Sequence, residues 1–102
     1  MTEKVLFVDR SSLAGSVIKI LARNIRLMSH DTIEVTVLTL GQLETHRFTD
    51  EKMIFVDPMI SLNHRVIRRI PKKIKTLNFT ISSYISLNAE IILEQIKTKK
   101  CI

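Results

Sequence analysis

The chain contains little cysteine, glycine or proline. Its only cysteine among 102 residues, Cys101, is the last but one, so no internal disulfide can form and a reducing, cytoplasmic setting is expected. No apolar run approaches the roughly 20 residues that a membrane-spanning helix needs. The charged start, from Met1 to Lys4, is unlike a signal peptide. With two glycines and two prolines, and with no linker, repeat or low-complexity segment, residues 1–102 are expected to form one domain.

The composition is that of a small folded protein with a basic surface. Hydrophobic residues make up 45% of the chain, which is too many for a disordered segment, and the formal net charge is +6. The positive charge is concentrated in residues 64–75, where Arg65, Arg68, Arg69, Lys72 and Lys73 lie. Clustered cations can bind nucleic acid, but this segment has no aromatic residue for base stacking. A solvated face that serves protein docking or solubility is therefore the preferred interpretation, and no nucleic-acid partner is expected.

Apolar patterning predicts alternating strands and helices. Strands are expected at residues 4–8, 33–40, 52–56 and 74–81, and helices at about 13–28, 62–70 and from Asn88 onward, with a short helical turn at 42–46. Such alternation is typical of an α/β fold. We therefore expect a four-stranded parallel sheet in the order 2-1-3-4, with helices on both faces in a Rossmann-like three-layer arrangement. The site of such a fold lies at the carboxyl ends of the strands.

The first strand ends at Asp9, and a short loop leads from there into an apolar helix. This arrangement aims backbone N–H groups at whatever lies above the strand, which suits an anion. The residues of this candidate phosphate loop are Arg10, Ser11, Ser12, Leu13, Ala14, Gly15 and Ser16. The carboxylate of Asp9 would repel an anion, so the loop favours phosphate chemistry whereas its first side chain opposes it.

A second acid, Asp57, follows the third strand, next to Pro58. Asp9 and Asp57 on adjacent strands could hold a divalent cation, or one could be phosphorylated as in response-regulator receiver domains. A receiver, however, has two adjacent acids after its first strand, where this chain has Asp9 and Arg10, and it has a fifth strand. The alternative is structural: Asp57 orders the turn that follows it, and Asp9 pairs with Arg10 or bonds loop amides. No cofactor or dedicated metal site is expected.

The order and spacing of these features resemble the enzyme IIB subunits of the bacterial sugar phosphotransferase system (PTS), of the lactose/cellobiose type. That family has a loop of the form Cys-x-x-Gly-x-Ser-Thr-Ser after its first strand, and its Cys falls on Asp9 and its Gly on Ser12. Its third strand ends in an apolar run followed by Gly-Pro-Gln, where this chain has Asp57, Pro58 and Met59. A Tyr follows its last strand, where Tyr84 stands, so Pro58 and Tyr84 join Asp57 as the expected neighbouring wall of the site.

The resemblance implies a transferase component of sugar uptake that meets a IIA protein, a membrane IIC subunit or a regulator. In that family the Cys thiolate carries a phosphoryl group from IIA to the sugar. Asp9 cannot simply replace it, because a carboxylate is a poorer nucleophile and aspartyl phosphate formation relies on a metal. Two hypotheses follow: a diverged component with altered phosphotransfer, or a non-catalytic module, a pseudoenzyme, that docks on PTS partners. A low-molecular-weight tyrosine phosphatase fits less well, since both its Cys and its Arg are missing.

Overall fold

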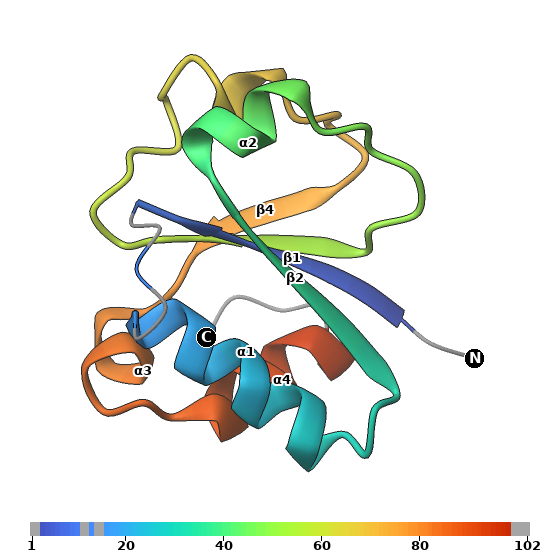
Figure 1. The fold of residues 1–102 in the computed structure, drawn as a ribbon, viewed down its shortest axis with the longest axis vertical. Helices are drawn as coiled ribbons and strands as arrows, with labels where there is room; N and C mark the ends of the chain where they lie inside the picture. The colour runs from blue at the N-terminus through green and yellow to red at the C-terminus, as the bar shows by residue number, and fades with distance from the viewer. Residues whose placement is uncertain (1–2, 11–12, 14–15, 99–102) are drawn as a thin grey trace.

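The computed structural model describes residues 3–10, 13 and 16–98. Its centre is a four-stranded parallel sheet in the order β2-β1-β3-β4, as predicted. The strands are β1 (Glu3–Asp9), β2 (Ile33–Thr39), β3 (Met53–Val56) and β4 (Lys75–Asn78). Their carboxyl ends share one edge of the sheet, on the left in Figure 1.

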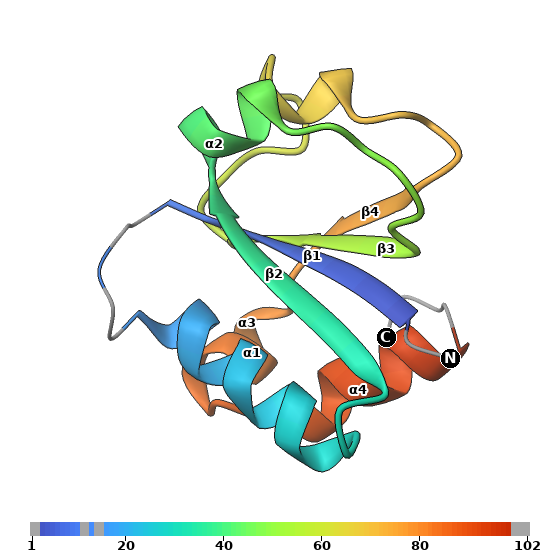
Figure 2. The same cartoon turned by 45° about the vertical axis from the view of Figure 1, so that its right-hand side comes forward.

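Helices cover both faces of the sheet, which confirms the three-layer prediction. One face carries α1 (Val17–Met28), α3 (Ile81–Ile85) and α4 (Ala89–Thr98), and the other carries α2 (Leu40–Thr45) and the 3-10 turn η1 (Ile67–Arg69). Figure 2 shows the sheet between these two layers. The side chains of a strand alternate between its faces, so each layer receives its own half of the strand residues.

Two hydrophobic clusters result from this alternation. Val5 and Phe7 of β1 pack toward α1 and α4, whereas Leu6 and Val8 pack toward α2 and η1. The Phe7 ring meets the rings of Phe55 and Phe79 edge-on, with centroids 5.7 and 4.8 Å apart. Full burial of one such aromatic side chain contributes roughly 1.5–3 kcal/mol.

The helix that follows β1 begins at Val17, later than the predicted start near residue 13. Ser16 is its N-cap: the Ser16 hydroxyl accepts a hydrogen bond from the backbone N–H of Lys19 at 3.2 Å. A serine cap holds an extended backbone at the cap itself, so the helix cannot extend through it. The first buried position of the helix, Ile18, lies two residues after this cap.

The predicted third helix over residues 62–70 is wrong. Only Ile67–Arg69 form a single 3-10 turn, and the preceding residues form turns. Asn63 and His64 are weak helix formers, and the like charges of Arg65, Arg68 and Arg69 repel one another at helical spacing. A single turn is enough to bury Val66, Ile67 and Ile70. A longer helix would therefore bury no further apolar side chain that could offset the charge repulsion.

The fourth strand is shorter than its predicted range of residues 74–81. It ends at Asn78, and Thr80 then caps an additional short helix, α3. The Thr80 hydroxyl accepts a hydrogen bond from the backbone N–H of Ser83 at 3.2 Å. The β-branched residues of this stretch are typical of a strand, so the sequence pattern did not predict the cap at Thr80. By contrast, the last helix starts where it was predicted, and Asn88 caps it: Asn88 Oδ1 accepts a hydrogen bond from the N–H of Ile91 at 3.3 Å.

Candidate functional site

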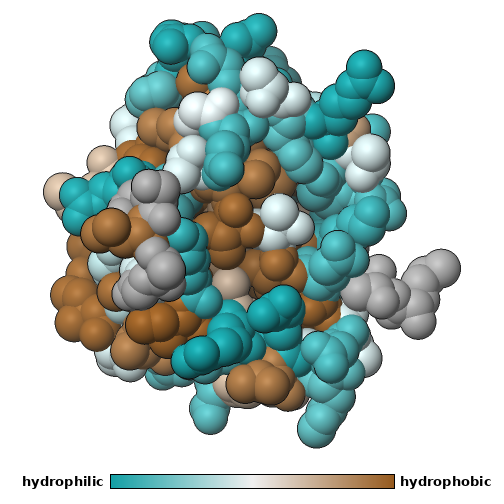
Figure 3. All heavy atoms as spheres, viewed as in Figure 1, coloured by the Kyte–Doolittle hydropathy of each residue, from teal (hydrophilic) through white to brown (hydrophobic). Residues whose placement is uncertain are grey.

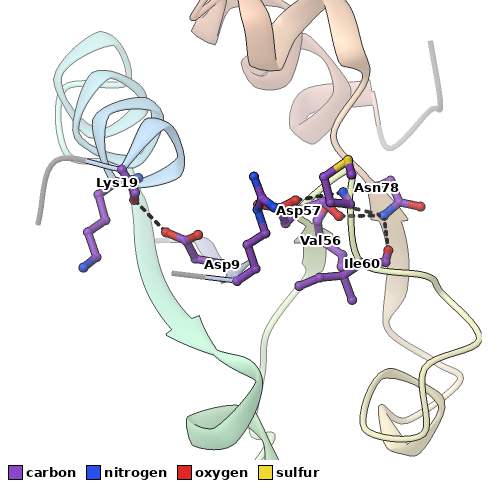
Figure 4. A network of polar contacts seen from close by, with 9 residues as sticks. Asp9, Lys19, Val56, Asp57, Ile60 and Asn78 are labelled. Atoms are coloured by element: carbon purple, nitrogen blue, oxygen red, sulfur yellow. Dashed lines mark hydrogen bonds and ion pairs between the residues drawn. The ribbon is translucent and has the colours of Figure 1, made fainter. Parts of the chain in front are cut away.

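Asp9 ends β1 with its side chain directed toward the start of α1 (Figure 4). The residue is only 2% exposed, and its Oδ2 accepts a hydrogen bond from the Ser16 hydroxyl at 2.6 Å. Ser16 thus caps α1 and binds Asp9 with the same oxygen atom. A carboxylate beside a helix N-terminus is stabilised by the helix dipole. The carboxylate of Asp9 therefore occupies the place that the sequence suggests for an anion.

The loop between β1 and α1 is only partly described. Leu13 is 72% exposed, and its carbonyl accepts a hydrogen bond from Lys19 Nζ at 2.9 Å. The remaining loop positions of the predicted phosphate site lie outside the described residues: Ser11, Ser12, Ala14 and Gly15. The prediction that Asp9 bonds loop amides therefore concerns residues outside the described part of the chain.

Arg10 turns toward the neighbouring strand and pairs with Asp57. Its Nε lies 3.7 Å from Asp57 Oδ2, so the ion pair joins the ends of β1 and β3. The Asp57 side chain is fully buried, whereas that of Arg10 is 57% exposed. Within the described part of the chain Asp57 Oδ2 has no hydrogen bond. The guanidinium of Arg10 is therefore the charge partner that compensates this buried carboxylate oxygen.

The other oxygen of Asp57 orders the following turn, which confirms the structural alternative for this residue. Asp57 Oδ1 accepts a hydrogen bond from the N–H of Met59 at 2.8 Å, and the Asp57 carbonyl accepts one from the N–H of Ile60 at 2.9 Å. Pro58 lies half-buried inside this turn, and Met59 is 71% exposed. An aspartate that bonds the backbone two residues later is a common turn element.

Sequence reasoning missed Asn78, which holds the end of β3 from the end of β4. Its Nδ2 lies within hydrogen-bond distance of three backbone oxygens: those of Ile60 at 2.9 Å, Asp57 at 3.1 Å and Val56 at 3.4 Å. Figure 4 shows this network beside Asp57. Asparagine is rare inside strands, so its presence in a predicted strand was the signal that could have identified it.

Tyr84 lies in α3, half-buried, and packs against the hydrophobic cluster that includes Phe7. The structure therefore places it on the face of the sheet that carries α1 and α4. Its predicted part as a wall of the site stays a prediction.

The carboxylates of Asp9 and Asp57 are held by different partners. Asp9 is bound by Ser16 at the start of α1, and Asp57 is bound by Arg10 and the turn after β3. In Figure 4 the two side chains lie apart, with Asp57 toward Asn78. Among residues 3–10, 13 and 16–98, no group of three or more His, Cys, Asp or Glu side chains is placed to hold a metal ion.

The three histidines lie in separate segments of the structure. His46 Nε2 lies 2.8 Å from Glu51 Oε2, and His64 Nδ1 accepts a hydrogen bond from the N–H of Val66 at 3.2 Å. His30 is exposed at the turn after α1, with a positive φ of 53°. None of these contacts joins a histidine to Asp9 or Asp57.

No protein-family model matches the chain, and no curated protein matches it. In the part of the chain that the structure describes, no helix has the length and apolarity to cross a membrane.

Proposed function

We propose that this protein is a cytoplasmic, enzyme IIB-like component of a lactose/cellobiose-type phosphotransferase system that docks on its partners without carrying the phosphoryl group. The partners are a IIA protein, a membrane IIC subunit or a regulator of the same system. The family rests on the sequence resemblance, and the parallel sheet in the order β2-β1-β3-β4 is consistent with it. The loss of phosphotransfer rests on Asp9.

The condition of Asp9 carries the proposal. A phosphoryl acceptor must present an oxygen or sulfur atom to a phosphohistidine on another protein, and Asp9 is 2% exposed. Its Oδ2 also accepts a short hydrogen bond of 2.6 Å from Ser16, which lowers its nucleophilicity. The negative charge of Asp9 further opposes the approach of a phosphoryl group.

Exposed apolar side chains support a docking role for the same edge of the sheet. Leu13 after β1, Met59 after β3 and Ile81 after β4 are 72%, 71% and 67% exposed. Because the three strands are adjacent and parallel, these side chains stand around one edge. Figure 3 shows apolar surface on the left, over α3. Apolar side chains beside a polar rim are typical of protein interfaces.

Intact-protein mass spectrometry after incubation with a phosphorylated IIA protein tests the first half of the proposal. The unaltered chain should form no phosphoryl adduct, because Asp9 is buried and negatively charged. Asp9→Cys, alone or with Ser12→Gly, should gain a thiol-linked adduct on part of the protein. The substitution restores the nucleophile of the family and removes the negative charge and the hydrogen bond from Ser16, although position 9 stays buried. An adduct on the unaltered chain that maps to Asp9 would contradict the proposal and support phosphotransfer by an altered route.

Titration with the unphosphorylated IIA protein and with detergent-solubilised IIC tests the docking half. Met59→Asp should weaken binding to one of these partners by about tenfold or more, as expected for a large apolar contact. Leu27→Asp is the matched control, because Leu27 is 67% exposed near the far end of α1. Equal affinities of the two variants, or no binding of the unaltered chain to either partner, would overturn the docking role.

A further inference from the structure

A second surface lies away from Asp9, beside the edge strand β4. A groove of about 560 Å³ runs between β4 and the segment that contains η1. Its apolar lining includes Ile67, Ile70 and Ile74, which are 4–6% exposed and belong to the core. We call this surface the β4 groove. It borders Lys75 and Thr76, at the opposite end of β4 from Asn78 and the network around Asp57.

The β4 groove carries positive charge. Arg68, Lys72 and Lys75 line it, and no Asp or Glu is among the described residues that line it. Arg68 and Lys72 are exposed and have no ion-pair partner in the described part of the chain, whereas nearby Arg65 pairs with Glu44 at 3.0 Å. An apolar floor beside the exposed cations Arg68 and Lys72 is complementary to an acidic chain that also bears apolar side chains.

The backbone of β4 also presents hydrogen-bonding groups at this surface. β4 is an outer strand, with β3 on its inner side. The N–H of Phe79 donates to the carbonyl of Val56 at 2.9 Å, so the backbone polar groups of Phe79 and Leu77 point toward β3. Because backbone groups alternate along a strand, the N–H and C=O of Thr76 face outward. Thr76 itself lines the β4 groove.

We propose that the β4 groove binds an extended acidic segment of a partner protein, which adds a strand to the outer edge of β4. Main-chain hydrogen bonds at Thr76 set the direction of the segment. Every second side chain of the segment is apolar and packs against the isoleucines that line the groove. Acidic side chains of the segment meet Arg68 and Lys72. This binding is independent of the docking proposed at the carboxyl edge of the sheet, because the two surfaces share no residue.

The test uses the full chain and a fluorescent octapeptide of alternating Glu and Val. We expect saturable binding by fluorescence anisotropy, with shifts of the Thr76 amide in NMR spectra. The same peptide with alternate backbone amides methylated should bind at least about tenfold more weakly, because it cannot pair as a strand. The corresponding peptide of alternating Gln and Val should also bind more weakly, because it lacks the negative charge.

Charge reversal on the protein provides the matched comparison. The double variant Arg68→Glu, Lys72→Glu should lose about tenfold or more in affinity for the Glu–Val peptide. The double variant Arg23→Glu, Arg26→Glu changes the net charge equally on the exposed face of α1 and should change affinity by less than about threefold. Both variants replace exposed side chains, and circular dichroism verifies their folds.

Three results would overturn the proposal. One is no saturable binding of the Glu–Val peptide, and another is an equal loss in both charge-reversed variants, which would mean binding to net charge alone. The third is unchanged affinity of the backbone-methylated peptide, which would exclude strand addition. A DNA oligonucleotide or a phosphatidylserine vesicle that binds more tightly than the peptide, and depends on Arg68 and Lys72, would mean that the occupant is another macromolecule.

Discussion

Arg10 is the residue whose role depends most on the tertiary structure. It is exposed and adjacent in sequence to Asp9, yet its ion pair is with Asp57 across the sheet. The Oδ2 of Asp57 has no hydrogen bond within the described part of the chain. Removal of Arg10 would leave this buried oxygen without its ion-pair partner.

Arg10→Ala should therefore lower the free energy of unfolding by about 1–2 kcal/mol, measured by urea denaturation. The expected loss is at the lower end for a buried charge because Arg10 is partly in water. Arg65→Ala is the control, since it breaks a surface pair with Glu44 and should cost less than about 0.5 kcal/mol. Equal losses in the two variants would mean that Asp57 does not need Arg10.

Glu51 gives the molecule a contribution to stability that depends on pH. Burial raises the pKa of Glu51, but hydrogen bonds from His46 and from the N–H of Thr49 outweigh burial. The pKa of Glu51 therefore lies below its ordinary value of 4.5. A lowered carboxyl pKa stabilises the folded state above the unfolded pKa, and this stabilisation is lost as the pH falls through the folded pKa.

Glu51→Gln should thus be less stable than the unaltered chain at neutral pH, and the difference should shrink as the pH falls below 4.5. Urea denaturation of both proteins across this range measures it. Glu94→Gln, at an exposed position of α4, is the control. A difference that stays constant with pH would show that Glu51 acts through packing rather than through its charge.

At the scale of elements, side-chain caps mark where the helices begin. Ser16 and Thr80 set the starts of α1 and α3, and Asn88 sets that of α4. Helix α4 also buries one polar side chain, Gln95, beside Ile92 and Ile96 on its inner face. Gln95 is 1% exposed, and neither its Oε1 nor its Nε2 has a hydrogen-bond partner in the described part of the chain.

Gln95→Met should raise the free energy of unfolding by about 1 kcal/mol, because it removes a buried amide without partners and keeps a similar volume. Thermal and urea denaturation measure the change. Gln42→Met is the contrasting variant, since Gln42 Oε1 accepts a hydrogen bond from the N–H of Thr39 in a capping box. That variant should lose about 0.5–1 kcal/mol. A destabilised Gln95→Met would mean that the amide of Gln95 is bonded after all.

At the scale of the whole molecule, the net charge of +6 raises the question of nucleic acid. The cations of the basic segment are all exposed: Arg65, Arg68, Arg69, Lys72 and Lys73. No aromatic side chain is interleaved with them for base stacking. The charge is therefore expected to act through general electrostatics or through contacts with acidic protein surfaces.

Any affinity for DNA or RNA should consequently be weak, independent of sequence and lost between low and physiological salt. Fluorescence anisotropy with two oligonucleotides of equal length and different sequence, measured over a series of salt concentrations, tests this expectation. Binding that persists at physiological salt, or that prefers one of the two sequences, would contradict it and favour a regulatory nucleic-acid role.

The sequence by itself determined the sheet, because β-branched apolar runs separated by helical patterns can bury both faces of a strand only in a parallel, layered fold. It also placed Asp9 and Asp57 at one edge, since parallel strands end together. The tertiary structure alone decided what these carboxylates contact. Ser16 reaches Asp9, Arg10 reaches Asp57 and Asn78 reaches the turn at Ile60 through side-chain directions that no spacing along the chain encodes. The tertiary structure also decided that no helix forms over residues 62–70, because three apolar side chains there reach the core from a single turn.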